Sequence, residues 1–506
     1  MNKRGDIAIK NISSNLLLQL VVIVSGFIIP KLLISSFGSD TYGLVASITQ
    51  FLSLIMLLEA GIGPVIKSKL YKYIAKDDKN KILLVLKDAD KFFKRIGFIF
   101  IGYVLLLCMV YPFMNNEFNS SFTISLIIIM AVSTLFEYFF GIVYNLYLQA
   151  DKKYYVTSYI QIICYILNIV LVVALIHFGA SVLVVKIANT LAFIIKPMFQ
   201  AYYVRKKMKI EFKKANGEYK IDNKLDGLSQ HIAYVINSNT DVTVLTIFSN
   251  LATVAVYSVY NLVATAVRNI VSAFTNGMDS IFGDMLARNE QEVLNRSFSI
   301  YEFLYYTISM IIYLCTLILI VPFIRVYTSG ITDANYIQPL FGIIIILASL
   351  VVTARTIYSN LVYAVGHFKQ TNLVSWIEAI TNIVLSIVLV YQFGLIGVAI
   401  GTLVSGLIRL LYFMYYSSRI ILKRSLLLCL KWILVMLVEV SLVIILMNID
   451  ILLYMPTNYF NWMIYAIFVL MIVIVIVILV NTLFNYKLAK EVFSFVKEKV
   501  SRKAKQ

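Results

Sequence analysis

Long apolar segments recur along almost the whole chain, and they restrict its fold more than any other feature. A membrane-spanning helix needs about 20 mainly apolar residues. The run from Ile467 to Val480 is apolar throughout and does not alternate at every second residue, which favours helices over a transmembrane β-barrel. Only 14% of the 506 residues are charged, whereas soluble domains hold about 25%. The sequence therefore predicts an all-α polytopic membrane protein.

The apolar segments predict about fourteen transmembrane helices. The first segment lacks a clear small-residue cleavage site, so we expect it to stay as the first span. The predicted spans lie near residues 11–35, 42–66, 96–113, 121–149, 155–177, 180–203, 229–249, 252–281, 300–327, 336–364, 372–392, 395–416, 430–448 and 459–484.

The basic residues predict the orientation of these spans. With the N-terminus in the cytoplasm, the cytoplasmic segments hold 36 of the 44 Lys and Arg residues, and the outer loops hold none. By the positive-inside rule this predicts a bacterial cell (inner) membrane protein with both termini in the cytoplasm. The net charge of +18 thus reflects topology and contact with the lipid bilayer, and no nucleic-acid partner is expected.

Three short matches indicate an internal repeat of about six spans. The first copy reads Asn145-Leu146, Asn168 to Leu171 and Phe178-Gly179, and the second reads Asn360-Leu361, Asn382 to Leu385 and Phe393-Gly394. Chance similarity among apolar residues is the alternative. Because six is even, both copies enter the membrane in the same direction, as halves related by an axis along the membrane normal.

The repeat predicts two pseudo-symmetric six-helix lobes, at residues 1–204 and 229–417. A basic cytoplasmic connecting loop, 205–228, joins them, and two extra helices with a basic cytoplasmic tail follow at 418–506. Two lobes around a central axis favour transport by alternating access, with the substrate between the lobes.

Arg268 is the first candidate for a binding residue, because a charge inside a membrane usually faces a cavity or a partner. It lies near the middle of the eighth predicted span. Helical spacing places Asn261, Thr275, Asn276 and Asp279 on the same face. A planar guanidinium group suits phosphate, so this polar stripe predicts contact with an anionic head group.

Three further bases lie inside predicted spans. Arg409, Lys196 and Arg355 are expected to complete a cationic cavity for a diphosphate head group. The alternative for each base is a salt bridge or a carbonyl contact that fixes helix packing. Lys186, by contrast, is expected to extend outward to the membrane interface.

Acidic residues inside the spans are candidates for coupling to an ion, either Na⁺ or H⁺. Asp241 follows the polar sequence Asn237 to Thr240 in the seventh span, and Glu59 and Glu137 are weaker candidates. Hydrogen bonding between helices is the alternative. The four Cys and three His residues form no cluster, so no metal or cofactor is expected.

Enzyme motifs are few. No Walker A motif occurs, and Asp88-Ala89-Asp90 lies on a basic amphipathic stretch, where a solvated helix face is the simpler interpretation. The predicted outer loops are too short for a large catalytic domain. The sequence therefore indicates a transporter and not an enzyme.

Several motifs resemble those of polysaccharide flippases of the Wzx type, in the multidrug/oligosaccharidyl-lipid/polysaccharide exporter superfamily. They are Pro30-Lys31, Phe37 to Leu44, Leu58 to Gly63, Asn239-Thr240-Asp241 and Val256-Tyr257. The resemblance implies two rocking lobes and a substrate of undecaprenyl-diphosphate-linked oligosaccharide. It also implies a basic residue at Lys31, and a polysaccharide polymerase and chain-length machinery as partners.

The first span has fewer arginines than the lipid II flippases of that superfamily, which favours a capsule, exopolysaccharide or O-antigen unit over a peptidoglycan precursor. Two alternatives remain open. One is a cation-coupled multidrug efflux antiporter of the same superfamily, which should hold fewer basic groups within its spans. The other is a membrane saccharide polymerase, which would need a large outer loop.

Overall fold

The computed structural model describes residues 3–59, 62–114, 117–212, 228–275, 278–447, 454–492 and 494. These residues form helices and connecting turns, with no β-strand among them. Thirteen helices are long and apolar enough to cross a membrane: Ile9–Phe37, Ser39–Glu59, Lys79–Met114, Ser120–Ala150, Tyr154–His177, Val182–Lys207, Leu251–Thr275, Gln291–Tyr327, Pro339–Val365, Phe368–Phe393, Leu395–Ile421, Leu427–Leu446 and Tyr459–Phe484. The prediction of an all-α polytopic membrane protein is confirmed.

Helix α10, Leu228–Phe248, occupies the remaining predicted position, the seventh. It is more polar than the other spans because it carries the sequence from Asn237 to Asp241. Its polar groups have partners: Asn239 Nδ2 donates to a main-chain carbonyl one turn earlier at 2.7 Å, and Asn239 Oδ1 accepts from Gln50 and from Ser53 Oγ. A membrane-spanning helix tolerates such polar residues when neighbouring helices form hydrogen bonds with them.

The chain folds into two compact units, Met1–Val256 and Tyr257–Gln506. Unit 1 contains α1 (Lys3–Phe37), α2 (Ser39–Ser53), α3 (Met56–Glu59), α4 (Ile62–Ala75), α5 (Lys79–Met114), α6 (Ser120–Phe136), the π-helical turn η1 (Glu137–Gly141), α7 (Ile142–Ala150), α8 (Tyr154–His177), α9 (Val182–Tyr202), the π-helical turn η2 (Tyr203–Lys207), α10, and the start of α11 (Leu251–Ser272). Its core is a continuous cluster of apolar side chains from α2, α4, α5, α6 and α7.

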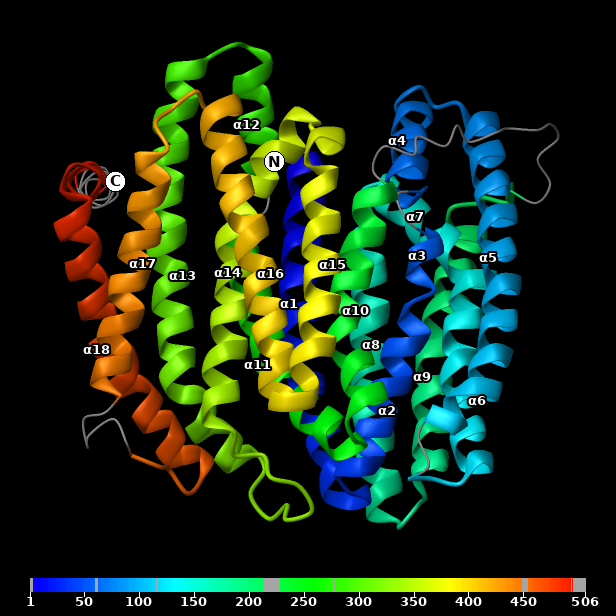
Figure 1. Ribbon diagram of the computed structural model, residues 1–506. Helices are drawn as coiled ribbons and strands as arrows, with labels where there is room; N and C mark the ends of the chain where they lie inside the picture. The colour runs from blue at the N-terminus through cyan, green and yellow to red at the C-terminus, as the bar shows by residue number, and fades with distance from the viewer. Residues whose placement is uncertain are drawn as a thin grey trace. The chain divides into compact units, whose positions relative to one another are not determined.

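Unit 2 contains the rest of α11, the 3₁₀ turn η5 (Ala273–Thr275), α12 (Met278–Ala287), α13 (Gln291–Tyr327), α14 (Pro339–Val365), α15 (Phe368–Phe393), α16 (Leu395–Tyr416), the π-helical turn η6 (Ser417–Ile421), α17 (Leu427–Leu446) and α18 (Tyr459–Phe484). The last two helices lie against α13, as Figure 1 shows. Between them, Asn481 Nδ2 donates to Glu439 Oε1 at 2.8 Å, and both residues are buried.

The second predicted span, 42–66, is not one helix. Helix α2 ends at Ser53, α3 follows, and α4 begins at Ile62; residues 60–61 lie outside the described ones. Between α2 and α3 the main-chain bonds shorten to three-residue spacing, since Leu54 N donates to Phe51 O at 3.1 Å and Leu57 N donates to Leu54 O at 3.0 Å. Pro64 suits the first turn of the new helix α4. The apolar segment therefore continues past the end of the spanning helix.

The order of helices repeats along the chain. In the first copy, the spanning segment α2–α3 precedes a shorter helix, α4, and the long helix α5. In the second copy, α11 and η5 precede α12 and the long helix α13. The sixth helix of each copy, α9 or α16, ends in a π-helical turn, η2 or η6. The predicted lobe boundaries stay a prediction, since the compact units divide within α11.

Candidate functional site

Three charged residues meet inside unit 2. Arg355 on α14 donates to Glu378 Oε1 on α15 at 2.6 Å, and Arg409 on α16 donates to Glu378 Oε2. The Glu378 side chain is 1% exposed and that of Arg409 is 5% exposed. Close packing of α15 against α16 makes the contact possible: a Cβ atom on Gly401 would lie 2.5 Å from Ser386 Oγ.

The triad of Arg355, Glu378 and Arg409 has a formal net charge of +1. Two guanidinium groups share the single carboxylate of Glu378. Arg409 Nε is buried and has no hydrogen-bond partner among the residues that the structure describes, although its guanidinium lies 5.3 Å from the centre of the Phe413 ring. A buried charge that is not compensated is costly, and the triad keeps a formal charge of +1.

Unit 1 holds a cluster of the opposite sign. Lys196 on α9 donates to Glu137 on η1 at 3.0 Å. Tyr138, next to Glu137 in the chain, donates to Glu59 at the end of α3. Gly141 allows η1 to approach α9, because a Cβ atom there would lie 2.8 Å from Pro197 Cβ. Two carboxylates and one ammonium group give this cluster an excess negative charge, which suits a cation.

The two clusters occupy related positions in the repeat. Lys196 and Arg409 lie 213 residues apart, each on the sixth helix of its copy. Two turns before the base on the same helix, Asn189 donates to Asn168 at 2.9 Å in unit 1. The corresponding bond in unit 2 runs from Thr402 to Asn382 at 3.4 Å. The bases share a position, but their acids come from different helices, so the two copies have diverged in charge.

Arg268, in unit 2, has no ion pair among the residues that the structure describes. It is half-buried on α11, and Arg268 Nη2 donates to Thr265 Oγ1 at 3.0 Å. An intramembrane guanidinium group without a counter-charge is a functional candidate.

The predicted polar stripe through Arg268 is wrong as a continuous helical face. Helix α11 ends at Ser272 and the 3₁₀ turn η5 follows it, so Thr275 does not continue the α-helical spacing from Arg268. Asn276 lies outside the described residues, and Asp279 belongs to the next helix, α12, with a side chain outside the described set.

The remaining predicted residues lie in unit 1. Lys31 is half-buried on α1, and Asp241 is buried on α10. Lys186 does not extend outward as expected: it is 8% exposed on α9 and makes no hydrogen bond or ion pair with any described residue. The fold of unit 1 encloses the side chain, which therefore does not reach the membrane interface.

Sequence reasoning missed a second buried cluster in unit 2. Arg424 Nη2 donates to the two Glu302 carboxylate oxygens at 2.7 and 2.9 Å, and the Tyr358 hydroxyl donates to the same carboxylate. Burial lowers the pKa of Arg424, but the charge and hydrogen bonds of Glu302 outweigh it and hold the pKa above its usual range. Spacing gave no signal, since 122 residues separate the partners.

No family model matches the sequence, and no curated protein matches it. Solved structures match the fold. A structure of the lipid II flippase MurJ in an inward closed conformation has a TM-score of 0.67 and 15% identity, and the match covers 95% of this chain and 99% of that one. The chain has the fold of the MOP superfamily transporters.

Two further MOP structures match over a shorter part of the chain. An inward-facing multidrug resistance transporter of the MATE family has a TM-score of 0.63 and 15% identity, covering 80% of this chain and 98% of that one. A MOP transporter from Pyrococcus furiosus, described as having a binding pocket of reverse polarity, has a TM-score of 0.53 and 17% identity, covering 82% and 94%. At these identities the likeness establishes the fold.

Proposed function

We propose that the protein moves undecaprenyl-diphosphate-linked oligosaccharide repeat units from the cytoplasmic to the outer leaflet by alternating access, for the synthesis of a cell-surface polysaccharide. The observation that carries this proposal is the excess positive charge in unit 2. The Arg355–Glu378–Arg409 triad retains one positive charge, and Arg268 adds a guanidinium group without a described counter-charge. Arginine binds phosphate oxygens through paired, charge-assisted hydrogen bonds.

The extent of the fold match supports a flippase. The MurJ structure matches 95% of the chain, whereas the MATE structure matches 80%. The unmatched fifth is close in length to residues 418–506, which hold α17 and α18. In a flippase, the lipid tail stays in the bilayer while the head group crosses, so added helices beside the transport unit can contact the tail.

A second candidate function is a cation-coupled multidrug antiporter. The excess negative charge around Glu59 and Glu137 in unit 1 favours it, since drugs of that class are cationic. In the flippase, the same carboxylates and Asp241 are the candidates for binding a coupling Na⁺ or H⁺. The two functions differ in what the arginines of unit 2 would do, so a substitution there separates them.

The test is reconstitution into liposomes with a fluorescent undecaprenyl-diphosphate oligosaccharide in both leaflets. A quencher outside the vesicle reports how quickly the head group equilibrates. We expect the wild type to accelerate equilibration and Arg268→Ala to slow it by at least about tenfold, the effect of about 1.4 kcal/mol. Arg288→Ala is the matched control, because Arg288 is exposed in the turn after α12 and its one described ion pair is with Asp284, one turn earlier.

Three outcomes are informative. Slowing by Arg268→Ala alone supports both the substrate and the site. Equal rates for wild type and Arg268→Ala would keep the flippase and remove Arg268 from its site. If the wild type does not accelerate equilibration under Na⁺ or H⁺ gradients, while efflux of a cationic dye is accelerated, the antiporter replaces the flippase.

A further inference from the structure

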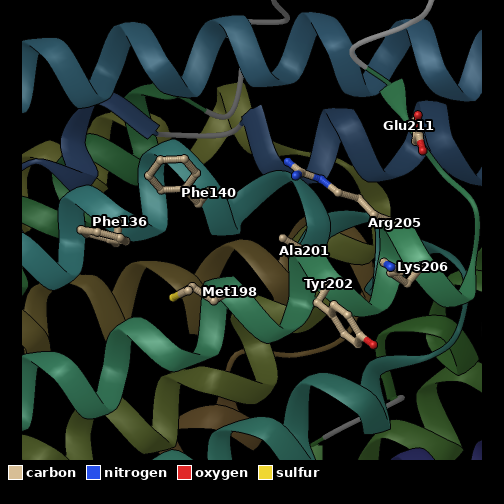
Figure 2. Close-up of a pocket in the computed structure, with 8 residues that line it drawn as sticks. All are labelled: Phe136, Phe140, Met198, Ala201, Tyr202, Arg205, Lys206 and Glu211. Atoms are coloured by element: carbon tan, nitrogen blue, oxygen red, sulfur yellow. The ribbon is translucent and has the colours of Figure 1, made fainter.

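A groove of about 610 Å³ opens on unit 1, between the fourth and sixth helices of the first copy. Figure 2 shows its lining, which comes from α6, η1, α9, η2 and the segment that follows η2. The lining residues are Phe136, Phe140, Met198, Ala201, Tyr202, Arg205, Lys206 and Glu211. Its volume falls within the range of about 300–1,000 Å³ that is typical of small-molecule sites.

The lining has an apolar part and a charged part. Phe136, Phe140 and Met198 form the apolar part, and Phe140, Met198 and Tyr202 have exposed side chains on membrane-spanning segments. Arg205 and Lys206 lie at the basic end of α9, which is the cytoplasmic end by the positive-inside rule. A ligand that fits both parts must carry a hydrocarbon chain and an anionic group at the membrane interface.

Arg205 is held in place for such a group. Arg205 Nε donates to the Tyr144 hydroxyl at 2.6 Å, and its guanidinium lies 5.3 Å from the centre of the Tyr144 ring. Neither its two terminal amino groups nor Lys206 Nζ contacts a described residue through a hydrogen bond or ion pair. Lys207, in the same π-helical turn, lies over the Tyr203 ring instead. Among the described residues, Arg205 and Lys206 thus line the groove with donors that have no hydrogen-bond partner, whereas Lys207 lies outside the lining.

Two π-helical turns shape the groove. η1 carries Phe140 and η2 carries Arg205 and Lys206, and both pack against α9. A π-helical turn displaces side chains from their α-helical positions and is frequent at functional sites. Helix α14 of the second copy corresponds to the segment that holds η1, and it is α-helical throughout Pro339–Val365. The second copy therefore lacks the turn η1 that shapes the groove of the first copy.

We propose that the groove binds one membrane phospholipid of the cytoplasmic leaflet, with its phosphodiester on Arg205 and Lys206 and an acyl chain along Phe136, Phe140 and Met198. Charge complementarity selects this occupant. The two bases of the lining, Arg205 and Lys206, outnumber its one carboxylate, Glu211, so the lining suits the anionic phosphodiester of a lipid. Basic residues at this depth attract the anionic lipids of the cytoplasmic leaflet.

The test is native mass spectrometry of the full chain in a nonionic detergent, titrated with dioleoylphosphatidylglycerol or with dioleoylglycerol, which lacks phosphate. We expect one tightly bound phosphatidylglycerol and no comparable site for dioleoylglycerol. Removing one positive charge should weaken binding about fivefold, so Arg205→Gln with Lys206→Gln should weaken it about 25-fold. Lys207→Gln, the control from the same turn, should change it less than twofold.

Ala201→Trp tests the apolar part without changing charge, since Ala201 lines the groove. It should abolish the tight site, and size-exclusion profiles of every variant check that the fold is intact. Equal binding by wild type and the double variant would overturn the proposal. So would displacement of the lipid by stoichiometric undecaprenyl diphosphate, which would make the groove a substrate site. Neither result depends on whether the protein transports that substrate.

Discussion

Single charged residues in this protein are constrained by the low polarity of the membrane, where each must find a partner or a use. Glu378 forms ion pairs with two arginines, whereas Lys186 is buried, with 8% of its surface exposed, and has no described partner. The same rule predicted that charges within the spans would matter, and it now separates residues that stabilise packing from residues that remain available to a ligand.

Glu378→Gln should lower the stability of unit 2 by about 3–5 kcal/mol, because it leaves two buried guanidinium groups without a full counter-charge. Thermal unfolding of the purified protein in detergent measures the change. Glu491→Gln is the control: it removes the partner of Arg296, whose side chain is 75% exposed, and an exposed pair contributes at most about 1 kcal/mol. Equal effects would show that the triad is not a buried unit in the folded protein.

Lys186→Met should stabilise the protein, because it replaces an uncompensated buried amine by an apolar side chain of similar length. We expect the midpoint of thermal unfolding to rise by about 2 °C or more. A fall in the midpoint would contradict this interpretation and would indicate that Lys186 binds a group that the described residues do not supply.

At the scale of helices, close packing depends on a few glycines and on breaks in the spans. Gly43 on α2 faces the main-chain carbonyl of Leu251 at the start of α11, and a Cβ atom would collide with it. Gly26 on α1 has no neighbour within 4 Å of the same position. Both glycines lie in apolar helices, so the sequence alone does not distinguish their roles.

Gly43→Ala should destabilise unit 1 by about 1–3 kcal/mol, since the added methyl group meets backbone that must move. Gly26→Ala should stabilise it by about 0.5–1 kcal/mol, the usual gain of alanine over glycine within a helix. Both changes are read from thermal unfolding in the same detergent. Changes of the same sign and size would mean that α2 does not pack on Leu251 as the structure shows.

At the scale of the whole molecule, the two copies of the repeat carry a base at the same position, Lys196 or Arg409, but the net charge around that base differs in sign. The cluster around Lys196 has an excess of negative charge, and the cluster around Arg409 has an excess of positive charge. In the flippase that we propose, the first copy binds the coupling cation and the second copy binds the anionic substrate.

Glu137→Gln should therefore remove the acceleration of transport by a Na⁺ or H⁺ gradient and leave slow equilibration without a gradient unchanged. The measurement is the liposome assay described above, run with and without each gradient. Lys196→Gln serves as the companion variant, because it removes the other partner of the ion pair and keeps both carboxylates. Retained gradient dependence in Glu137→Gln would exclude this carboxylate as the coupling group.

The sequence by itself determined the all-α membrane class and the approximate positions of thirteen apolar spans, since apolar length depends on local composition. The six-span repeat and its lobes stay a prediction. The sequence also identified the charged residues worth following. Only the tertiary structure decided their partners, because Glu378 and Arg409 lie on different helices and meet through packing at Gly401. It likewise ended the α-helix α11 at Ser272 and buried Lys186, outcomes that apolar periodicity does not encode.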